Sequence, residues 1–351
     1  MAEGNGQRRV LRLSELREGE EAVCFALLVE KFKGLTKRNE PFVRCHFRDR
    51  TVKLEAPIWA TNKLLRAAED WVEGQAYRLV TRLDNTPKYG KQLEIAEARL
   101  ASDRDDAADG FRFEDLVEAS KYDTSKLMKR IEELIEKNIV EPRLNQLVRT
   151  LLTDNAELFR KMPAASDMHH SFTAGLLEHV WSMTEVAASL ARHYAGYYSE
   201  LNPPLDRGLV VAAAILHDIG KLRELRYDPS KARYTKEGSL IGHVLMGRDM
   251  VREAAAKIEG FPAESLLLLE HAILAHHGKR EFGAPVLPQT LEALLVSYVD
   301  EMDAKMNSAA RERLRSVSEG EFTDRVYPLD NRRFYKGVPV PPPDDVADEG
   351  A

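Results

Sequence analysis

An apolar run that ends in charged groups is the feature that most restricts the folds this chain can adopt. Residues 209–215 read LVVAAAI, and LHDIGKL follows at residues 216–222. The run predicts a core helix, yet His217, Asp218 and Lys221 arrive together at its end. Burying such groups without partners costs several kcal/mol. The stretch is therefore either the polar end of a structural helix or half of a metal site.

Composition indicates a protein with an ample core and no membrane segment. With 44% hydrophobic and 31% charged residues, the 351-residue chain suits about two globular domains. No apolar run reaches the ~18 residues of a membrane span, and residues 1–9 lack the apolar core of a signal peptide. Two cysteines, Cys24 and Cys45, are too few for a disulfide framework or a cysteine zinc site. We expect a cytoplasmic protein that does not enter a membrane.

Charge is unevenly spread along the chain. The formal net charge is −6. Residues 8–100 hold 19 Lys and Arg against 14 Asp and Glu, whereas residues 101–351 hold 32 against 42. A mildly basic N-terminal third joined to an acidic remainder is typical of a polyanion-binding module attached to a second unit.

The N-terminal third has the alternating pattern of β-strands. Hydrophobic residues alternate from Val23 to Val29 in the first predicted strand and from Val43 to Phe47 in the second. Three further strands are predicted at 52–59, 76–83 and 92–100, with a helical stretch at 61–71. Five strands with a helix between the third and the fourth are the order of an oligonucleotide-binding (OB) barrel.

The pattern changes beyond residue 100. Residues 101–112 are small and polar and predict a linker. Apolar stripes at helical spacing then continue to about residue 310, the longest at 172–198, 207–222, 240–258, 264–277 and 289–306. The Pro-rich, acidic residues 337–351 predict disorder. We expect a multidomain chain: an all-β OB-fold domain at 8–103, a helical connector at 104–160, an all-α bundle at 161–325 and a C-terminal tail at 326–351.

Histidines are concentrated in the helical part. Nine of the ten fall between His169 and His277. From the helical periodicity and from their positions in the helices, we expect four histidines and two aspartates to face a shared interior: His179, His217, Asp218, His243, His276 and Asp300. A single histidine on an apolar helix face is more often a hydrogen-bonded core residue than a ligand. Their convergence favours a metal site, because a divalent ion satisfies several buried groups at once.

The types of ligand restrict the metal. Imidazole nitrogens and carboxylate oxygens, without thiolate, leave Mn²⁺, Fe²⁺, Co²⁺ and Zn²⁺ open. Six or seven ligands exceed what one tetrahedral ion needs, which indicates two neighbouring ions bridged by a carboxylate. Such a pair suits phosphoryl chemistry, because it stabilises both the entering and the leaving oxygens.

This ordered set of histidines and aspartates resembles the HD-domain metal-dependent phosphohydrolases. The resemblance assigns ligands to two ions: His179, His217, Asp218 and Asp300 to the first, and His243 and His276 to the second. Asp218 is then the best candidate for the bridging carboxylate. His277 could be a ligand, a phosphate contact or a helix-end group, because adjacent helical residues point about 100° apart.

A wider resemblance runs from about residue 8 to residue 336. An OB domain, a helical connector and the motifs HHSFTAGLLEHV, LHDIGKL, IGH, AHHG and SYVDEMDAK occur in the order of the YhaM-type 3′→5′ exoribonucleases. The resemblance implies an HD domain at 161–325. It also implies a manganese-stimulated hydrolase that trims single-stranded RNA, and to some extent single-stranded DNA, from the 3′ end. A homo-oligomer is compatible with it.

Other polar residues near these motifs are candidates for substrate contacts. Lys221, one turn beyond His217, could neutralise a phosphate or be an ordinary lysine near a helix end. His169 and His170 match a histidine pair of the family pattern and could bind substrate or lie in a loop before the helix. Asp303 could orient a histidine ligand or be a solvated helix carboxylate. We expect three catalytic residues: Asp218, Lys221 and His170.

The predicted barrel carries the candidate nucleic-acid contacts. On the face of the second and third strands these are Phe42, Arg44, Lys53 and Trp59, and in flanking loops they are Lys31, Phe32, Lys33, Lys88, Tyr89 and Lys91. Aromatic rings stack on bases at ~1–3 kcal/mol per base, and cations follow the phosphates. The alternative is that the rings belong to the barrel core and the lysines only solubilise the protein.

Three functions fit these patterns. The leading hypothesis is a metal-dependent 3′→5′ exoribonuclease that releases nucleoside 5′-monophosphates from single-stranded RNA. A phosphohydrolase of a small nucleotide or cyclic dinucleotide would not need the OB domain. A noncatalytic nucleic-acid-binding protein would be expected to have lost some of the ligands. Both alternatives stay open from the sequence.

Overall fold

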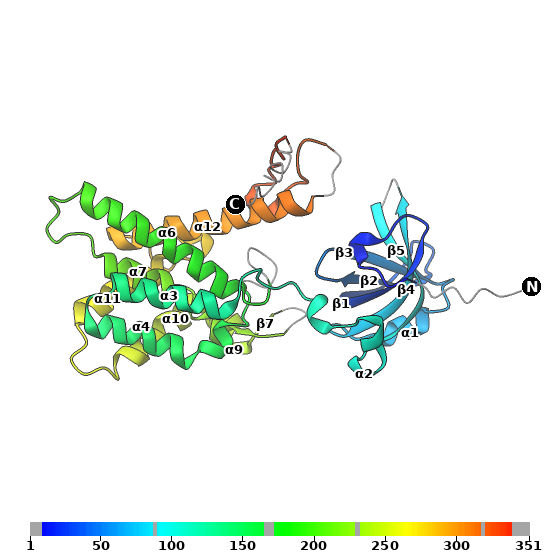
Figure 1. Ribbon diagram of the computed structural model, residues 1–351, viewed down its shortest axis with the longest axis horizontal. Helices are drawn as coiled ribbons and strands as arrows, with labels where there is room; N and C mark the ends of the chain where they lie inside the picture. Colours follow the sequence, from blue (N-terminus) through cyan, green and yellow to red (C-terminus); the bar gives the residue numbers. More distant parts are fainter. Residues whose placement is uncertain (1–8, 87–89, 165–171, 229–231, 317–319, 339–351) are drawn as a thin grey trace, which may run out of the picture.

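Two bodies of different secondary structure make up the chain (Figure 1). The computed structural model describes residues 9–86, 90–164, 172–228, 232–316 and 320–338. The N-terminal body is a β-barrel and the second body is helical. They lie end to end, so the molecule is elongated.

Five strands close into a barrel in the order β1-β2-β3-β5-β4. They are β1 (Glu21–Leu35), β2 (Pro41–Arg48), β3 (Lys53–Trp59), β4 (Ala76–Thr86) and β5 (Gly90–Leu100), with helix α1 (Leu65–Asp70) between β3 and β4. Neighbouring strands are antiparallel except β3 and β5. The order confirms the predicted OB barrel.

The first half of β1, from Ala22 to Leu28, is buried on both of its faces. Its inward residues, such as Cys24, lie in the barrel core. Its outward residues Phe25 and Leu27 are covered by Phe111 and Leu116 from the segment that follows the barrel. The ring centroids of Phe25 and Phe111 are 5.1 Å apart. This double burial explains why residues 22–29 are all apolar, although strand residues with one solvent-exposed face would alternate between apolar and polar.

Residues 101–112, expected to be a linker, instead pack on the barrel. They include the short helix α2 (Asp103–Asp106). The Asp106 carboxylate is buried and accepts hydrogen bonds from Arg99 and from the Ser102 N–H. The polar composition did not predict this contact, because the Asp106 carboxylate is paired inside the protein with the Arg99 guanidinium rather than hydrated by water. The positions of the domain boundaries stay a prediction.

The helical body surrounds α7 (Arg207–Leu216). Every residue from Gly208 to Leu216 is buried, so the apolar run is a core helix, as predicted. The larger helices are α3 (Thr124–Asn138), α4 (Pro142–Asp154), α6 (Gly175–Tyr197), α10 (His243–Ala255), α11 (Ala263–Ala275) and α12 (Leu291–Arg315). The smaller elements are α5 (Ala156–Phe159), α8 (Lys221–Glu224), α9 (Lys236–Ile241), β6 (Leu225–Arg226) and β7 (Arg233–Tyr234).

The helix expected at 207–222 is interrupted. It ends at Leu216 and resumes as α8 after a turn. Gly220 allows this turn to lie against α10, because a Cβ there would stand 1.9 Å from the His243 carbonyl oxygen. The interruption leaves the polar residues of the apolar run at a helix end, facing a second helix.

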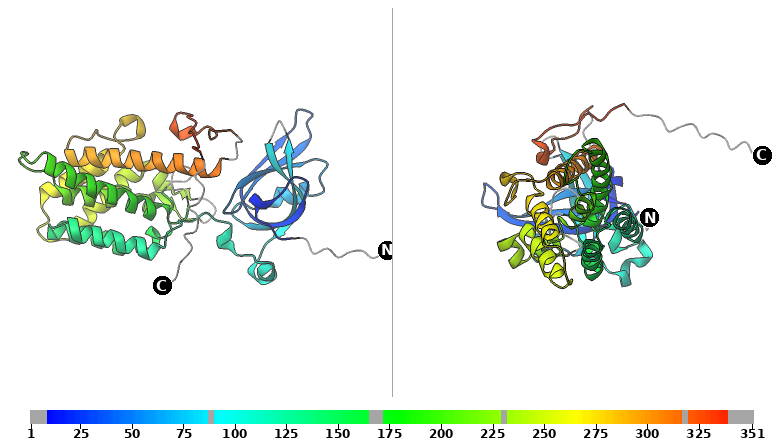
Figure 2. Two further views of the ribbon diagram at one scale, coloured as in Figure 1. Left: turned by 45° about the horizontal axis from the view of Figure 1, so that its top comes forward. Right: turned by 90° about the vertical axis from the view of Figure 1, so that its left-hand side faces the viewer.

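Helix α12 extends beyond the other helices toward the barrel, as Figure 1 and the left view of Figure 2 show. Residues 320–338 follow it and include the short helix η5 (Tyr327–Leu329). Residues 339–351, most of the tail expected to be disordered, lie outside the described residues. None of the described helices is long and apolar enough to cross a membrane.

Candidate metal centre

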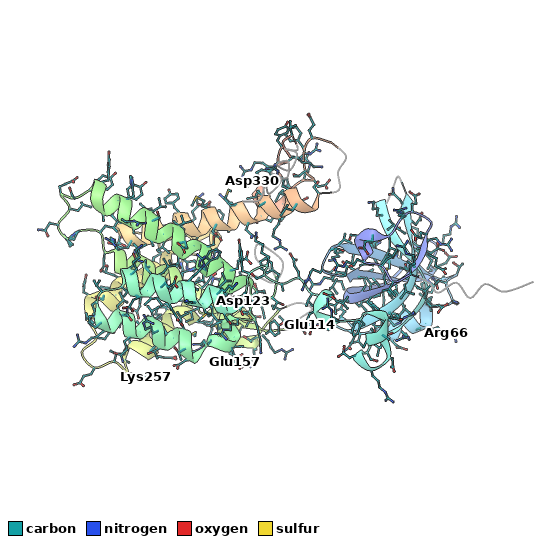
Figure 3. All side chains as sticks on the ribbon, in the orientation of Figure 1. Arg66, Glu114, Asp123, Glu157, Lys257 and Asp330 are labelled. Carbon is teal, nitrogen blue, oxygen red and sulfur yellow. The ribbon has the colours of Figure 1, made fainter. Side chains whose placement is uncertain are left out.

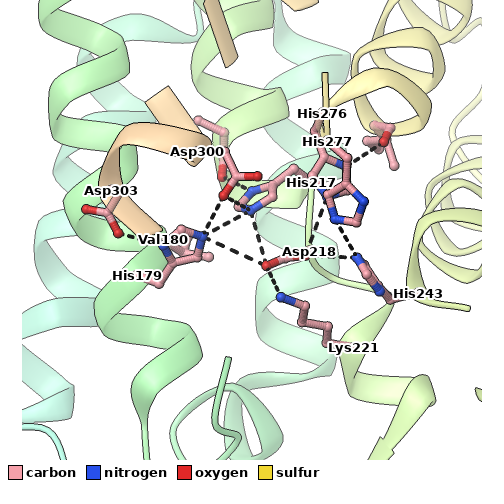
Figure 4. A network of polar contacts seen from close by, with 12 residues as sticks. His179, Val180, His217, Asp218, Lys221, His243, His276, His277, Asp300 and Asp303 are labelled. Atoms are coloured by element: carbon pink, nitrogen blue, oxygen red, sulfur yellow. Dashed lines mark hydrogen bonds and ion pairs between the residues drawn. The ribbon is translucent and has the colours of Figure 1, made fainter. Parts of the chain in front are cut away.

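Histidine and aspartate side chains from several helices meet inside the helical body (Figure 4). A first group joins α6, the turn after α7, and α12. His179 Nε2 lies 3.3 Å from His217 Nε2 and 3.2 Å from Asp300 Oδ1. Both histidines are fully buried. The three residues each offer one ligand atom within 4.8 Å of the others.

A second group lies on the other side of Asp218 (Figure 4). His243 opens α10 directly after Gly242, whose φ of +81° ends α9. His276 and His277 follow the last residue of α11. His243 Nε2 lies 3.3 Å from His277 Nε2. The structure thus brings His277, whose role the sequence left open, into the same cluster.

The Asp218 carboxylate lies between the two groups. Its Oδ2 is 3.3 Å from His217 Nε2 in the first group. Its Oδ1 is 3.4 Å from His243 Nε2 and 3.7 Å from His276 Nε2 in the second. This Oδ1 is buried and has no hydrogen-bond partner. One oxygen is therefore available to each group, which is what a bridging carboxylate requires.

Four of these histidines are held in place through Nδ1. The Nδ1–H groups donate from His179 to Asp303 (2.7 Å), from His217 to the Ala214 carbonyl (2.9 Å), from His243 to Glu224 (3.1 Å) and from His276 to the Ile273 carbonyl (2.7 Å). The roles follow from the partners, because carbonyl and ionised carboxylate oxygens only accept. Every Nε2 therefore faces the shared interior, the orientation of metal-ligating histidines.

The two groups differ in their electrostatics. Burial lowers the pKa of His276 far below its ordinary value, and the neighbouring His277 lowers it further. His276 is thus a neutral imidazole with an unpartnered Nε2. Burial alone would lower the pKa of His179, but hydrogen bonds to Asp300 and Asp303 outweigh burial and raise that pKa to about 10. Without an ion, His179 holds a proton at neutral pH.

A pair of divalent ions fits this set of donors. Asp218 Oδ1 and His276 Nε2 are buried polar atoms without hydrogen-bond partners, which is rare in folded proteins. Paired Nε2 atoms 3.3 Å apart match the separation of about 3.3–3.4 Å for two imidazoles on a tetrahedral ion with bonds of about 2.0–2.1 Å. Both cysteines lie in the barrel core, so the donors are nitrogen and oxygen atoms.

Lys221 contacts the centre itself. Its buried ammonium donates a 2.6 Å hydrogen bond to Asp218 Oδ2. Burial alone would raise the pKa of Asp218, but Lys221 and His217 outweigh burial and hold that pKa well below its ordinary value. Lys221 therefore keeps the Asp218 carboxylate ionised. The phosphate contact expected from the sequence stays a prediction.

Glu224 is a candidate that the sequence pattern did not single out. Its buried carboxylate accepts from the backbone N–H of His243 at 2.9 Å and from its Nδ1–H at 3.1 Å. A glutamate six residues after Asp218 was the only signal in the sequence. Asp303, which the sequence left between two roles, takes the corresponding place beside His179 at 2.7 Å.

Three aromatic rings and an arginine form a surface on the barrel. Phe42 and Trp59 face each other across β2 and β3 with ring centroids 5.6 Å apart, and Phe32 lies 6.1 Å from Phe42. The Arg44 guanidinium is 5.8 Å from the Phe42 ring centre. Phe32 and Trp59 are 59% and 47% exposed, whereas Phe42 is buried. Gly34 permits this packing, because a Cβ there would stand 2.8 Å from two of the rings.

Some of the predicted basic contacts already have partners within the protein, among them Arg44, which pairs with Glu55 at 3.7 Å. Lys31 donates to two backbone carbonyls at the end of α1, and Lys53 pairs with Glu30 at 3.1 Å. Lys33 and Lys91 are exposed. Four further predicted contacts lie outside the described residues: Lys88, Tyr89, His169 and His170.

Related sequences place this arrangement in a family. Residues 176–305 match the HD domain family. The 3′-5′ exoribonuclease YhaM of Geobacillus sp. (strain WCH70) is 36% identical over 322 residues, which cover 91% of this chain and 93% of that protein. The chain belongs to the YhaM family. Relatives of the same name from Bacillus licheniformis and Bacillus subtilis are each 33% identical over 91% of this chain and cover 96% and 95% of their own lengths.

The family match bears directly on the cluster. An HD domain implies divalent-metal binding, and the two groups around Asp218 are the described residues that could hold the ions. The family resemblance read from the ordered motifs is thereby confirmed.

Two further likenesses add no information about function. Residues 114–224 match a family described as putative helicase. The chain has no G-x-x-x-x-G-K-[ST] phosphate-binding motif, however. A domain of replication protein A from Methanococcus maripaludis aligns with 26% of this chain and 96% of its own length, at 14% identity and a TM-score of 0.22.

Proposed function

We propose that this chain is a metal-dependent 3′-5′ exoribonuclease that hydrolyses single-stranded RNA to nucleoside 5′-monophosphates. One observation carries the proposal: the Asp218 carboxylate lies between two histidine groups whose Nε2 atoms face it. The same chain contains an OB barrel and belongs to a family whose named members are exoribonucleases. Fold, site and relatives all favour phosphodiester hydrolysis.

The proposed ligands divide between two ions. The first would be held by His179, His217 and Asp300, the second by His243, His276 and His277, and both by Asp218. Bound divalent ions activate water and stabilise charge on phosphoryl oxygens. We propose Mn²⁺ as the ion; Fe²⁺, Co²⁺ and Zn²⁺ also suit imidazole and carboxylate donors.

The chain's own residues prepare this site. Asp303 and Glu224 hold the His179 and His243 rings with Nε2 inward, and Lys221 keeps the bridging carboxylate ionised. Charged side chains around the ligands are paired in the folded chain, so little rearrangement is needed when ions bind.

The barrel supplies contacts to the polymer. Phe32 and Trp59 present exposed rings on which bases can stack without regard to sequence. Arg44, Lys33 and Lys91 are exposed cations that can follow the phosphates. A free nucleotide would need none of these contacts, which favours a polymer substrate. Single-stranded DNA offers the same bases and phosphates, so we expect it to bind as well.

A labelled substrate tests the proposal. Single-stranded RNA carrying a 5′ label, incubated with Mn²⁺ and the purified protein, should give a descending ladder and free mononucleotides. The His217→Ala/Asp218→Ala variant should give no ladder. His193→Ala removes an exposed histidine outside the cluster and should cleave like the wild type.

Two results would redirect the proposal. Intact RNA together with hydrolysis of a free nucleotide would favour a small-molecule phosphohydrolase. Bound but uncut RNA, with no metal in the purified protein, would contradict any enzymatic role and leave a nucleic-acid-binding protein.

We further propose that the protein is a homo-oligomer in the cytoplasm. Helix α12 exposes an apolar stripe at helical spacing: Leu291, Leu294, Tyr298, Met302 and Met306. Exposed apolar patches of this kind mark protein–protein contacts. Sedimentation should give a multiple of the single-chain mass, and Tyr298→Glu should lower it. A monomeric wild type at micromolar concentration would refute the oligomer.

A further inference from the structure

The residues after α12 form a small folded unit that the proposed function does not use. Residues 320–338, here called the C-terminal hairpin, fold back on themselves. Thr323 N–H donates to the Phe334 carbonyl at 2.9 Å. Asp330, labelled in Figure 3, and Asn331 form the turn, both with a φ of +56°. Asp and Asn tolerate this left-handed conformation better than other side chains do.

The hairpin is fixed to α12. Arg313 of α12 donates from its guanidinium to the Lys336 carbonyl, with Nε at 3.0 Å. Val326 and Leu329 of the hairpin are buried. The hairpin is therefore held at the end of α12, which is the end nearest the barrel in Figures 1 and 2.

Exposed rings and cations gather on this hairpin. Phe322 and Tyr335 face each other across it, with ring centroids 5.6 Å apart, and they are 43% and 50% exposed. The Arg333 guanidinium lies 6.0 Å from the Phe322 ring centre. Arg325 and Arg332 are exposed as well. The exposed stripe of α12 differs from this pair of rings, because it contains a single ring, Tyr298, among leucine and methionine side chains.

The charge of this region departs from that of its surroundings. Residues 320–338 hold four Lys and Arg against three Asp and Glu, whereas residues 101–310 hold 25 against 33. A basic surplus at one end of an otherwise acidic body favours a polyanionic partner.

We propose that the C-terminal hairpin is a second binding site for single-stranded RNA, with Phe322 and Tyr335 stacking on a base and Arg333 following the backbone. Exposed rings beside cations are the combination that single-strand binding sites use. The proposal rests on the RNA substrate proposed above. It adds a contact outside both the barrel and the metal centre.

The hairpin is separate from the metal centre. Asp303 and Arg313 are ten residues apart on α12, which corresponds to about 15 Å along the helix axis. A dinucleotide in the metal centre would not reach the hairpin, whereas a longer strand would. Loss of the hairpin contact should therefore affect long substrates and spare short ones.

Fluorescence anisotropy of a long labelled oligouridylate tests the proposal, with the full-length chain in EDTA so that no cleavage occurs. We expect Phe322→Ala/Tyr335→Ala to weaken binding by about tenfold, the loss of roughly one stacked base. Tyr327→Ala removes another exposed ring of the same hairpin and should bind like the wild type. Cleavage of a dinucleotide in Mn²⁺ should be unchanged in the double variant.

Two further variants protect the test against misfolding of the hairpin. Phe322→Trp keeps a stacking ring and should retain affinity. Arg333→Gln keeps both rings, although it removes the 2.9 Å hydrogen bond from Arg333 Nε to the Thr323 carbonyl, and it should reduce the log–log salt slope of binding by about 0.7. Full affinity in the double variant with an unchanged salt slope in Arg333→Gln would overturn the proposal. An equal loss in Tyr327→Ala would also overturn it, because the ring pair would then have no special role.

Two outcomes distinguish an RNA contact on the hairpin from a protein contact and from a failure of the catalytic function. If the double variant dissociates an oligomer but binds RNA fully, the hairpin is a protein contact and the proposal fails. If the wild type cleaves neither RNA nor dinucleotide, the exoribonuclease function fails, while the anisotropy result still decides the role of the hairpin.

Discussion

Four histidines of the metal centre owe their orientation to acceptors that lie outside the centre. For His217 and His276 the acceptor is a backbone carbonyl three residues earlier, which comes with the helix itself. For the other two it is a carboxylate, Asp303 or Glu224. A substitution can remove these carboxylates, so they are the positions at which the orientation can be tested.

Asp303→Asn should weaken binding of the first ion. Asp303 accepts from His179 Nδ1 at 2.7 Å and from the Ser182 hydroxyl at 2.6 Å, so an amide would disturb both contacts. Loss of such an outer partner costs about 10–100-fold in metal affinity. We expect the lower end of that range in a Mn²⁺ titration followed by electron paramagnetic resonance. Asp249→Asn, which changes a carboxylate of α10 that is paired with Arg248, is the control. Equal affinity in both variants would show that Asp303 orients nothing.

Metal binding should release a proton from His179. In the absence of metal the pKa of His179 is about 10, because its hydrogen bonds to Asp300 and Asp303 outweigh burial. An ion needs the neutral ring, so proton and metal compete for Nε2. Affinity should therefore fall as the pH is lowered below about 10, by at most tenfold per pH unit for this one proton. Calorimetry at pH 7 in buffers of different ionisation enthalpy should report about one proton released from His179; zero release would contradict the assignment.

At the scale of elements, glycines set how closely the chain approaches itself around the centre. A Cβ on Gly220 would stand 1.9 Å from the His243 carbonyl oxygen and 2.5 Å from the Gly247 nitrogen. A Cβ on Gly238 would stand 2.2 Å from the Glu224 carbonyl oxygen. These obstacles are backbone atoms, which cannot rotate away. The turn after α7 therefore reaches the start of α10 only through glycine.

Gly220→Ala should destabilise the helical body. Its methyl group would push the turn away from α10, and overpacking of this kind costs about 1–3 kcal/mol or more. We expect the melting temperature to fall by roughly 5 °C and the second ion to bind more weakly. Gly196→Ala is the matched control, because nothing lies within 4 Å of a Cβ there in α6. A melting temperature equal to that of the control would rule out the close approach.

The helical pattern predicted which faces turn inward but not what closes the site. The 3.6-residue period was sufficient to bring His179 and Asp300 into one interior, since each lies on an apolar stripe. It did not predict the break after Leu216 or the position of Glu224, because both depend on a contact between distant backbones at Gly220. The hydrophobic period shows which face of a single helix is buried. It does not show how closely two helices approach each other.

At the scale of the whole molecule, the sequence predicted the two bodies better than their junction. The strand order predicted the OB barrel. The packing of Phe111 on Phe25 was not predicted, because Phe111 belongs to a segment that is otherwise polar. The sequence pattern also did not predict the contacts that join this segment to the helical body. There the Ser120 N–H donates to the Thr173 carbonyl at 2.9 Å, and Arg311 of α12 donates to both oxygens of Glu118. These contacts tie the segment after the barrel to the chain just before α6 and to α12.

Anomalous diffraction from crystals of the full-length protein grown with Mn²⁺ tests the metal centre most directly. We expect two peaks about 3.5–4 Å apart, one beside His179, His217 and Asp300 and the other beside His243, His276 and His277. Asp218 should lie between them, with one oxygen toward each. Peaks elsewhere, or a single peak with the Asp218 carboxylate turned away from it, would contradict a bridged two-ion centre.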